Sequence, residues 1–496
     1  MSSTTSPLGK QVRSGLIWSV VRSWGGRLAG IVIFFLLARI LSPEEFGVFA
    51  AAAAVLAFIE LFAEQGLSDA IVQKPAISPE ELNTAFLANF ILAALLVAAI
   101  WWCAPLIAAA MEIERLTGIL RIACLGILIN ALGFCQLALF RRNFQYRWLA
   151  VRTLVATVIS GAAGVWLALA GFGVWSLVGQ FLTNATVNLL LLWLKPIWKP
   201  GLGLSTAGFG QLLRYGGNIL GMRLLDFANT RVIELAIGAW LGAATLGLYS
   251  VGSRLYAILM QLLSSVVLDV AHAGFSRIAG ERERLAEAYY RAMTATAAFA
   301  VPCLVLVSAV APELCVVVFG SVWAGSAEIL KPLALLGAVQ TMQYYNGTGL
   351  NAVGKPGISF LIVIVRAATT VGVLAATRGC PLPVIVQTYV FGQLLTTPVS
   401  FYFGRKYLGV SIRRIVRRVC PFVMASAVLF LAVTQCRPWI EETIAAPVFR
   451  LPLLALAGGL AYGVLALAFG RKPLMDAIGK LKGRRQQDSI QKQATR

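Results

Sequence analysis

Long apolar runs, each bounded by charged or turn-forming residues, repeat along almost the whole chain. A helix needs roughly 20 apolar residues to cross about 30 Å of hydrocarbon, and this criterion predicts about fourteen membrane-spanning helices. They are expected at residues 16–38, 46–71, 82–105, 118–140, 154–170, 174–194, 212–236, 246–270, 288–311, 327–350, 358–376, 384–403, 419–434 and 451–469. The pattern predicts an all-α polytopic membrane protein.

Composition and charge agree with this prediction. Of the 496 residues, 59% are hydrophobic, and the mean hydropathy is +0.80, which is above the range of soluble globular proteins. Basic residues gather in alternate connections, so the positive-inside rule places both termini in the cytoplasm. We therefore attribute the net charge of +21 to topology and to attraction to anionic membrane lipids. No nucleic-acid partner is expected, because no soluble basic domain is evident.

The two halves of the chain echo each other. At an offset of 200 residues, Leu41, Phe46, Gly47, Val48 and Phe49 correspond to Leu241, Leu246, Gly247, Leu248 and Tyr249, and further on 119–121 resemble 329–331 and 179–183 resemble 392–396. We therefore expect two six-helix lobes, 1–194 and 195–403, related by a pseudo-two-fold axis along the membrane normal. Two additional C-terminal helices within 404–470 and a basic cytoplasmic tail at 471–496 complete the expected organisation.

Repeats of this kind commonly form transporters that alternate access to a site between the lobes. The other class considered is a membrane-embedded enzyme, such as a glycan polymerase or ligase. Such an enzyme needs catalytic groups at one face, but the outer connections are short, His272 is the one histidine, and no metal, nucleophile-elbow or phosphate-loop motif is present. We expect no enzyme, no metal and no cofactor, while coupling to a proton or sodium gradient stays open.

Cations inside the predicted spans are the first candidates for function. A cation facing lipid costs at least about 2.5 to 3.5 kcal/mol, so such residues usually face a protein interior or a wet cavity. The candidates for binding an anion are Arg27, Arg223, Arg231, Arg254 and Arg366. Arg366 is the strongest, because its span holds no acidic residue. Arg121 and Lys331, repeat equivalents near the expected cavity mouth, are explained equally well by snorkelling and by ligand contact.

Acidic residues in the same spans are candidates for ion pairing or ion coupling: Glu60, Glu64, Asp226 and Glu234. If the first two spans form a hairpin, the helical rise places Arg27 level with Glu60 and Arg22 level with Glu64. Structural ion pairs and a place in the cavity both remain open for these residues. In the seventh span the acids and arginines fall within an arc of about 140°, and with Arg254 from the next span three cations meet two carboxylates.

Four segments resemble a known family. They are 38–50 (ARILSPEEFGVFA), 63–74 (AEQGLSDAIVQK), 140–147 (FRRNFQYR) and 241–249 (LGAATLGLY), and they look like the polysaccharide-transport branch, the Wzx-type flippases, of the multidrug/oligosaccharidyl-lipid/polysaccharide exporter superfamily. The resemblance implies a flippase that moves undecaprenyl-diphosphate-linked oligosaccharide repeat units across the bacterial inner membrane for exopolysaccharide, capsule or O-antigen biosynthesis. It also implies that membrane arginines bind the diphosphate. One departure is Ala239, which follows Ile237 and Gly238 where relatives often have an arginine.

This resemblance leads to a specific mechanism. We expect the diphosphate and its sugars to enter a basic, inward-open cavity while the polyprenyl tail stays in lipid, after which rocking exposes the site outward. The lipid-linked oligosaccharide is the expected partner, and the polymerase and glycosyltransferases of the same pathway are further candidates. The alternatives are a drug or small-cation exporter of the same superfamily, which should prefer a net acidic cavity, and the membrane glycan polymerase or ligase.

Overall fold

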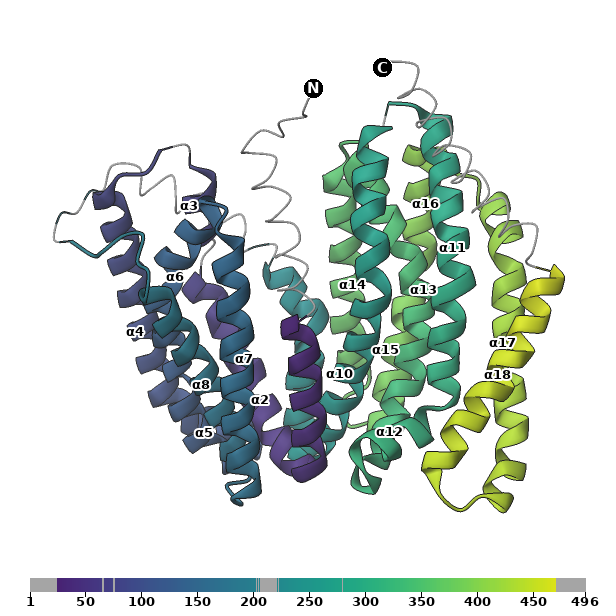
Figure 1. The fold of residues 1–496 in the computed structure, drawn as a ribbon, viewed down its shortest axis with the longest axis horizontal. Coiled ribbons are helices and arrows are strands. Elements are labelled where there is room, and N and C mark those ends of the chain that lie inside the picture. Colours follow the sequence, from purple (N-terminus) through teal and green to yellow (C-terminus); the bar gives the residue numbers. More distant parts are fainter. Residues whose placement is uncertain are drawn as a thin grey trace, which may run out of the picture. The chain divides into compact units, whose positions relative to one another are not determined.

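Figure 1 shows the computed structural model of the chain. The structure describes residues 25–64, 67–74, 76–201, 203, 205, 221, 223–278 and 280–469, with the backbone alone for Glu64 and 264–273. Within these ranges all regular elements are helices, and eleven of them are long and apolar enough to cross a membrane. The all-α polytopic prediction is confirmed, and the number of about fourteen spans stays a prediction.

The chain divides into two compact units, Met1–Ser250 and Val251–Arg496. The domain boundaries expected after residues 194, 403 and 470 stay predictions. The first unit begins, in its described part, with a helix over residues 25–40. It continues with α2 (Pro43–Glu64), α3 (Leu67–Gln73), α4 (Pro79–Ala110), α5 (Leu116–Ala123), α6 (Leu125–Arg142), α7 (Tyr146–Leu169) and α8 (Val174–Trp193). Helices α7 and α8 pack along each other, and α6 packs on both α4 and α8.

The second unit starts inside α10 (Val232–Arg277), which crosses the division between the units. It continues with α11 (Arg282–Ala309), α12 (Ala311–Phe319), the 3₁₀ helix η1 (Ser321–Ser326), α13 (Ala327–Ala352), α14 (Pro356–Ala376), α15 (Leu382–Leu395), α16 (Thr397–Leu408), α17 (Ile412–Thr443) and α18 (Pro447–Phe469). Helix α11 packs on α13 and α17, and α17 packs on α18. The core of this unit is mainly aliphatic and holds an aromatic cluster in which the rings of Phe275, Tyr289 and Tyr345 contact one another.

Large apolar side chains cover the outside of several helices. On α4, Leu95, Trp102 and Leu106 are 63%, 80% and 71% exposed, and on α18 Leu460 and Leu467 are 68% and 70% exposed. Rows of exposed apolar side chains on helices of this length suit hydrocarbon and would be a liability in water. The chain is a multi-pass membrane protein.

Two of the predicted spans are broken in the structure. Residues 118–140 form α5 and α6, which meet at Cys124, and residues 384–403 form α15 and α16, which meet at Thr396. The predicted spans 212–236 and 246–270 meet at Gly242, whose φ of 78° interrupts α10. This left-handed conformation is easily adopted by glycine.

The repeated glycines Gly47 and Gly247 lie in one reciprocal contact of the first unit. A Cβ on Gly47 would stand 1.7 Å from the carbonyl oxygen of Ala243, and a Cβ on Gly247 would stand 1.7 Å from that of Pro43. In each case the contacted carbonyl belongs to the residue four positions before the other glycine. The two segments therefore exchange equivalent contacts, as in a two-fold interface. This reciprocity supports the internal duplication.

Candidate functional site

A polar pocket of about 320 Å³ lies within the first unit. Helices α2, α3, α4, α6, α7 and α8 and the helical residues around 223 contribute its lining. The charged and amide residues of this lining are Glu60, Asp69, Asn89, Asn130, Arg141, Arg152, Asn184, Asn188 and Arg223. Such a density of polar groups inside an otherwise apolar helical unit marks it as a candidate functional site.

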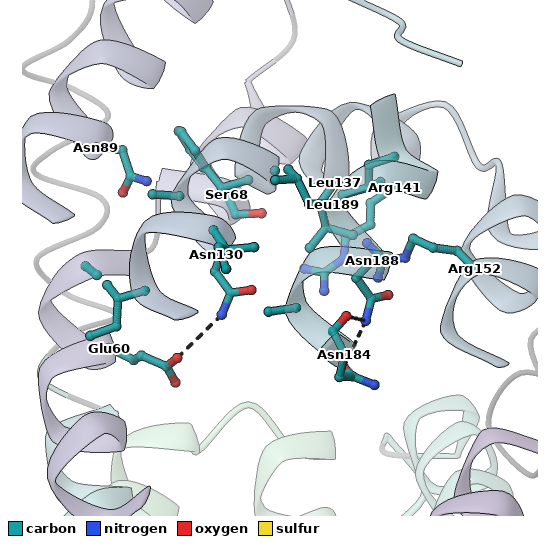
Figure 2. Close-up of a pocket in the computed structure, with 18 of the residues that line it drawn as sticks. Glu60, Ser68, Asn89, Asn130, Leu137, Arg141, Arg152, Asn184, Asn188 and Leu189 are labelled. Atoms are coloured by element: carbon teal, nitrogen blue, oxygen red, sulfur yellow. Dashed lines mark hydrogen bonds between the residues drawn. The ribbon is translucent and has the colours of Figure 1, made fainter. Parts of the chain in front are cut away.

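Two of the predicted site residues, Glu60 and Arg223, line this pocket. Asn130 donates from Nδ2 to Oε1 of Glu60 at 3.5 Å, and the Nη2 of Arg223 lies 3.5 Å from Oδ2 of Asp69. Asp69 was not singled out from the sequence, although it stands in the family-like segment 63–74. Figure 2 shows the Asn130 side chain pointing towards Glu60, to which this hydrogen bond joins it.

A second group of amides extends along α8. Asn188 donates from Nδ2 to the backbone oxygen and to Oδ1 of Asn184, both at 2.9 Å, and Asn184 donates to Oγ of Ser160 on α7 at 3.1 Å. Because residues four apart share a helix face, both asparagines point to the same side. The pairing with Ser160 ties α8 to α7.

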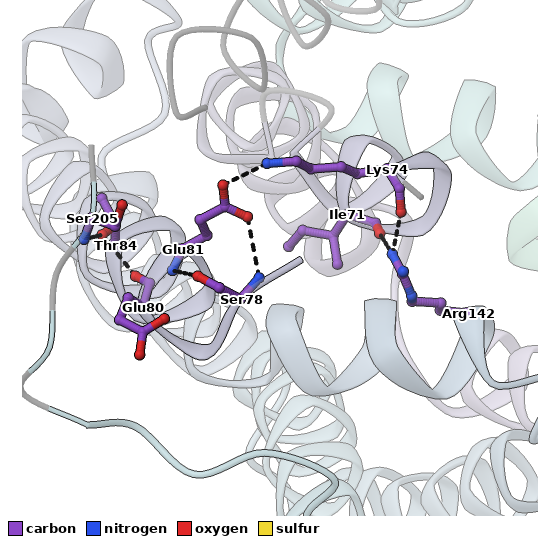
Figure 3. Close-up of polar contacts among 8 residues, drawn as sticks. All are labelled: Ile71, Lys74, Ser78, Glu80, Glu81, Thr84, Arg142 and Ser205. Atoms are coloured by element: carbon purple, nitrogen blue, oxygen red, sulfur yellow. Dashed lines mark hydrogen bonds and ion pairs between the residues drawn. The ribbon is translucent and has the colours of Figure 1, made fainter. Parts of the chain in front are cut away.

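Helix α3, which contributes Ser68 and Asp69 to the pocket, is held in place by a polar network (Figure 3). Arg142 at the end of α6 donates from Nη1 to the carbonyl oxygens of Ile71 and Lys74, at 2.8 and 2.5 Å. Lys74 Nζ binds Glu81 Oε1 at 2.6 Å, and Glu81 and Ser78 form a capping box at the start of α4. These contacts fasten α3 and the residues after it to α4 and α6. The wall of the pocket that α3 forms is therefore positioned by residues that do not themselves line the pocket.

The other predicted residues of the first unit lie outside the pocket lining. Arg231, in the turn directly before α10, binds Glu234 in the first turn of that helix, with Nη1 at 2.9 Å from Oε2, so the expected ion pairing of this stripe is present for that pair. Asp226 is exposed. Arg27 is half-buried and, among the described residues, no ion pair joins it to Glu60. Arg22 and the Glu64 side chain lie outside the described residues.

Arg121, expected near the cavity mouth, packs on α4. Its Nε donates to the carbonyl oxygen of Trp101 at 3.2 Å, and its guanidinium lies 5.4 Å from the centroid of the Trp101 ring. Its repeat equivalent Lys331 is half-buried near the start of α13, where its carbonyl oxygen accepts a hydrogen bond from Ser308. Both stay candidates for the mouth of a cavity.

Arg366 of α14 has a neutral partner. Its Nε donates to Oε1 of Gln393 on α15 at 3.1 Å, and Gln393 donates in turn to Oγ1 of Thr370 at 2.9 Å. In the described part of the chain no carboxylate lies within 4.0 Å of Arg366. Gln393 thus orients a cation without neutralising it.

Arg254 is exposed on α10 in the second unit. Its role in anion binding, like that of the other four arginines, stays a prediction. Within the described ranges no group of three or more His, Cys, Asp and Glu side chains is arranged to hold a metal ion.

Sequence reasoning selected charges and missed amides. Asn184 and Asn188 were readable as a pair on one face of an apolar span, because two amides four residues apart in a membrane helix need partners as charges do. The other asparagine of α4, Asn83, binds Gly203 and does not line the pocket, and the neighbours of Asn89 in the pocket come from other helices. Nothing in the local sequence could place it there.

Comparison with known proteins identifies the family. The sequence model of the family described as "Polysaccharide biosynthesis protein" matches residues 36–328. The chain is 29% identical over 366 residues to the succinoglycan biosynthesis transport protein ExoT of Rhizobium meliloti (strain 1021), with 74% of each chain covered. It is 22% identical over 417 residues to the lipopolysaccharide biosynthesis protein WzxC of Escherichia coli (strain K12), with 81% of this chain and 84% of the relative covered.

Solved structures share the fold. The lipid II flippase MurJ, in an inward closed conformation, matches with a TM-score of 0.74 at 15% identity over 92% of this chain and 99% of its own. An inward-facing multidrug resistance MATE family transporter of the MOP superfamily matches with a TM-score of 0.63 at 16% identity, over 79% of this chain and 98% of its own. Together with the family match, these likenesses confirm the resemblance carried by the four sequence segments.

Proposed function

The chain belongs to the family of polysaccharide biosynthesis proteins, and on that premise we propose that it is a flippase for lipid-linked oligosaccharides. Its substrate is an undecaprenyl-diphosphate-linked repeat unit, which it moves across the inner membrane for exopolysaccharide, capsule or O-antigen assembly. It is a transporter and catalyses no reaction. The observation that carries the proposal is the match to a polysaccharide transport protein over three quarters of both chains.

The charge of the membrane-spanning part suits a diphosphate. Arginine can hold phosphate oxygens through two parallel N–H groups, and such charge-assisted hydrogen bonds are among the strong ones. Arg366 supports this assignment, because its partner Gln393 is neutral and leaves the positive charge available. Arg27, Arg223, Arg231 and Arg254 are the other proposed diphosphate ligands. Of these, Arg223 and Arg231 would exchange their carboxylate partners for phosphate.

The proposed mechanism is alternating access. The diphosphate and sugars enter a basic cavity from the cytoplasmic side while the polyprenyl tail remains in lipid, and α17 and α18 guide that tail. Rocking of one lobe against the other then exposes the headgroup outward. Exchange of a proton or a sodium ion at Glu60, Glu64, Asp226 or Glu234 would couple the cycle to an ion gradient.

The flippase proposal also implies where the protein is located and which proteins act before and after it. In this proposal the chain resides in the bacterial inner membrane with both termini in the cytoplasm, which the basic residues of alternate connections support. It receives its substrate from the glycosyltransferases of the pathway and delivers it to the polymerase.

The test is mass spectrometry of lipid-linked oligosaccharides, separated by leaflet, from cells depleted of the protein. A complete diphosphate-linked repeat unit held in the inner leaflet is the expected result. Repeat units that reach the outer leaflet and stay unpolymerised would instead identify a polymerase or ligase and overturn the proposal.

Arg366→Gln in the re-introduced gene tests the anion site. We expect it to retain repeat units in the inner leaflet, whereas Arg366→Lys restores part of the transport because it keeps the charge and loses the two-pronged geometry. Arg378→Gln, which removes an exposed arginine just beyond the same helix, is the matched control and should transport normally. Equal transport by Arg366→Gln and the control would refute the assignment.

A further inference from the structure

The polar pocket of the first unit contains buried atoms that no described protein group satisfies. Oγ of Ser68 and the Oδ1 atoms of Asn89 and Asn188 are buried without a hydrogen-bond partner among the described residues. Asn89 is only 4% exposed. An unsatisfied buried polar atom is costly in a folded protein, so three that border one pocket point to a polar occupant that completes their hydrogen bonds.

The pocket walls differ in charge (Figure 2). One side carries Glu60 and the Asn89 amide, and the opposite side carries Arg141 and Arg152 beside Asn188. The Arg223–Asp69 pair compensates itself, so the lining holds one more cation than acid. An occupant therefore meets hydrogen-bond acceptors at one end and positive charge at the other.

Size and chemistry narrow the occupant further. A volume of about 320 Å³ lies at the lower end of ligand pockets, so it admits one small polar group and excludes a whole repeat unit. Amide side chains offer both donors and acceptors, which matches the adjacent hydroxyls of a sugar ring. The arginine wall matches an anionic group attached to that ring.

We propose that this pocket binds one sugar ring of the transported oligosaccharide together with an adjacent anionic group. The hydroxyls hydrogen-bond to Asn89, Asn188 and Glu60, and the anionic group binds Arg141. The inference rests on the proposed flippase function and adds a sugar-recognition subsite inside the first unit. The anionic group comes either from an acidic sugar of the repeat unit or from the diphosphate next to the first sugar.

The test uses the full chain in proteoliposomes and two probes, undecaprenyl-diphosphate-linked disaccharides that end in glucose or in glucuronic acid. Translocation is followed by the accessibility of the sugar diols to periodate, which does not cross the bilayer. The variant with both Asn89→Leu and Asn188→Leu removes the amides at similar side-chain size, and Arg141→Gln removes the charge. The matched controls are Asn143→Leu and Arg147→Gln, at exposed positions between the end of α6 and the first turn of α7. Size-exclusion profiles check the folding of every variant.

We expect the double asparagine variant to translocate both probes about tenfold more slowly than its control. If the acidic sugar supplies the anion, Arg141→Gln slows the glucuronic acid probe about tenfold and spares the glucose probe. If the diphosphate supplies it, both probes slow equally. Rates equal to the controls for all variants would overturn the subsite, as water alone would then fill the pocket, while wild-type transport would keep the flippase proposal intact.

A failure of the flippase proposal has a different signature. Wild-type vesicles would then expose no more of either probe than protein-free vesicles do. In that case calorimetric titration of the purified full chain with glucuronic acid and glucose 1-phosphate decides about the pocket by itself. Binding that is lost in the double asparagine variant supports the sugar-binding pocket, and the absence of binding to the wild type overturns it.

Discussion

The ion pair between Arg437 of α17 and Glu313 of α12 allows a quantitative prediction. Nε and Nη2 of Arg437 each lie 3.0 Å from a carboxylate oxygen of Glu313, and Nη2 also donates to the carbonyl oxygen of Ala309. The Glu313 side chain is only 4% exposed. Removal of one partner from a buried pair leaves an uncompensated charge and costs about 3–5 kcal/mol. We therefore expect Arg437→Gln to be strongly destabilising.

The matched control is Arg284→Gln. Arg284 Nη1 lies only 2.6 Å from Glu281 Oε2, but the two side chains are 58% and 53% exposed. Exposed pairs contribute about 0–1 kcal/mol to stability. Loss of the Arg284–Glu281 pair should therefore lower the stability less than loss of the Arg437–Glu313 pair, although its distance is shorter. The measurement is the apparent melting temperature of each purified variant in detergent, from the folded fraction that elutes after heating.

A double variant separates the charge from the packing. Glu313→Gln added to Arg437→Gln removes the orphaned carboxylate, so it should recover most of the lost stability. The reasoning is refuted if Arg284→Gln lowers the melting temperature as much as Arg437→Gln does. It is also refuted if the double variant is no more stable than Arg437→Gln alone.

Two further substitutions test other contacts. Gly47→Ala should cost about 1–3 kcal/mol in thermal stability, because its Cβ would stand 1.7 Å from a backbone carbonyl oxygen. Gly30→Ala, with no atom within 4 Å, should be neutral or stabilising by up to about 1 kcal/mol, and equal effects would contradict the close approach. Gln393→Glu would place a carboxylate beside Arg366 and should stop export of repeat units while the fold is kept. The exposed Gln387→Glu on the same helix is its control, and unimpaired export by Gln393→Glu would argue against an anion site at Arg366.

The apolar pattern was sufficient to predict helices and their approximate ends. Long runs of lipid-compatible residues have only one way to satisfy their backbone groups, as helices, so spans such as 82–105 and 174–194 were readable without tertiary information. The interruptions at Cys124 and Thr396 have only weak local signals, Gly126 and Pro398, each two residues further on. Pro398 lacks the N–H that would continue the helix, but neither residue by itself fixes where the helix ends. The number of spans also depends on charged segments for which hydropathy is a weak guide.

The candidate site was predicted less well than the fold, for a physical reason. Intramembrane charges are conspicuous in a sequence, and Glu60, Arg223 and Arg366 were selected on that ground. Their partners are set by tertiary contacts: Arg223 lies beside Asp69, and Arg366 binds Gln393 rather than an acid. The amides of the pocket come from α4, α6 and α8, so their convergence is a property of the packed unit.

The reciprocal glycine contact also bears on how the two similar segments around Gly47 and Gly247 can vary. Around it the two segments differ, with Phe46 against Leu246, Val48 against Leu248 and Phe49 against Tyr249, while glycine stands at both 47 and 247. Each glycine makes room for the backbone of the other copy, so neither copy can acquire a side chain there alone. We expect natural variation in this family to be held at both positions together, since the backbone around each glycine is part of the environment that selects the other.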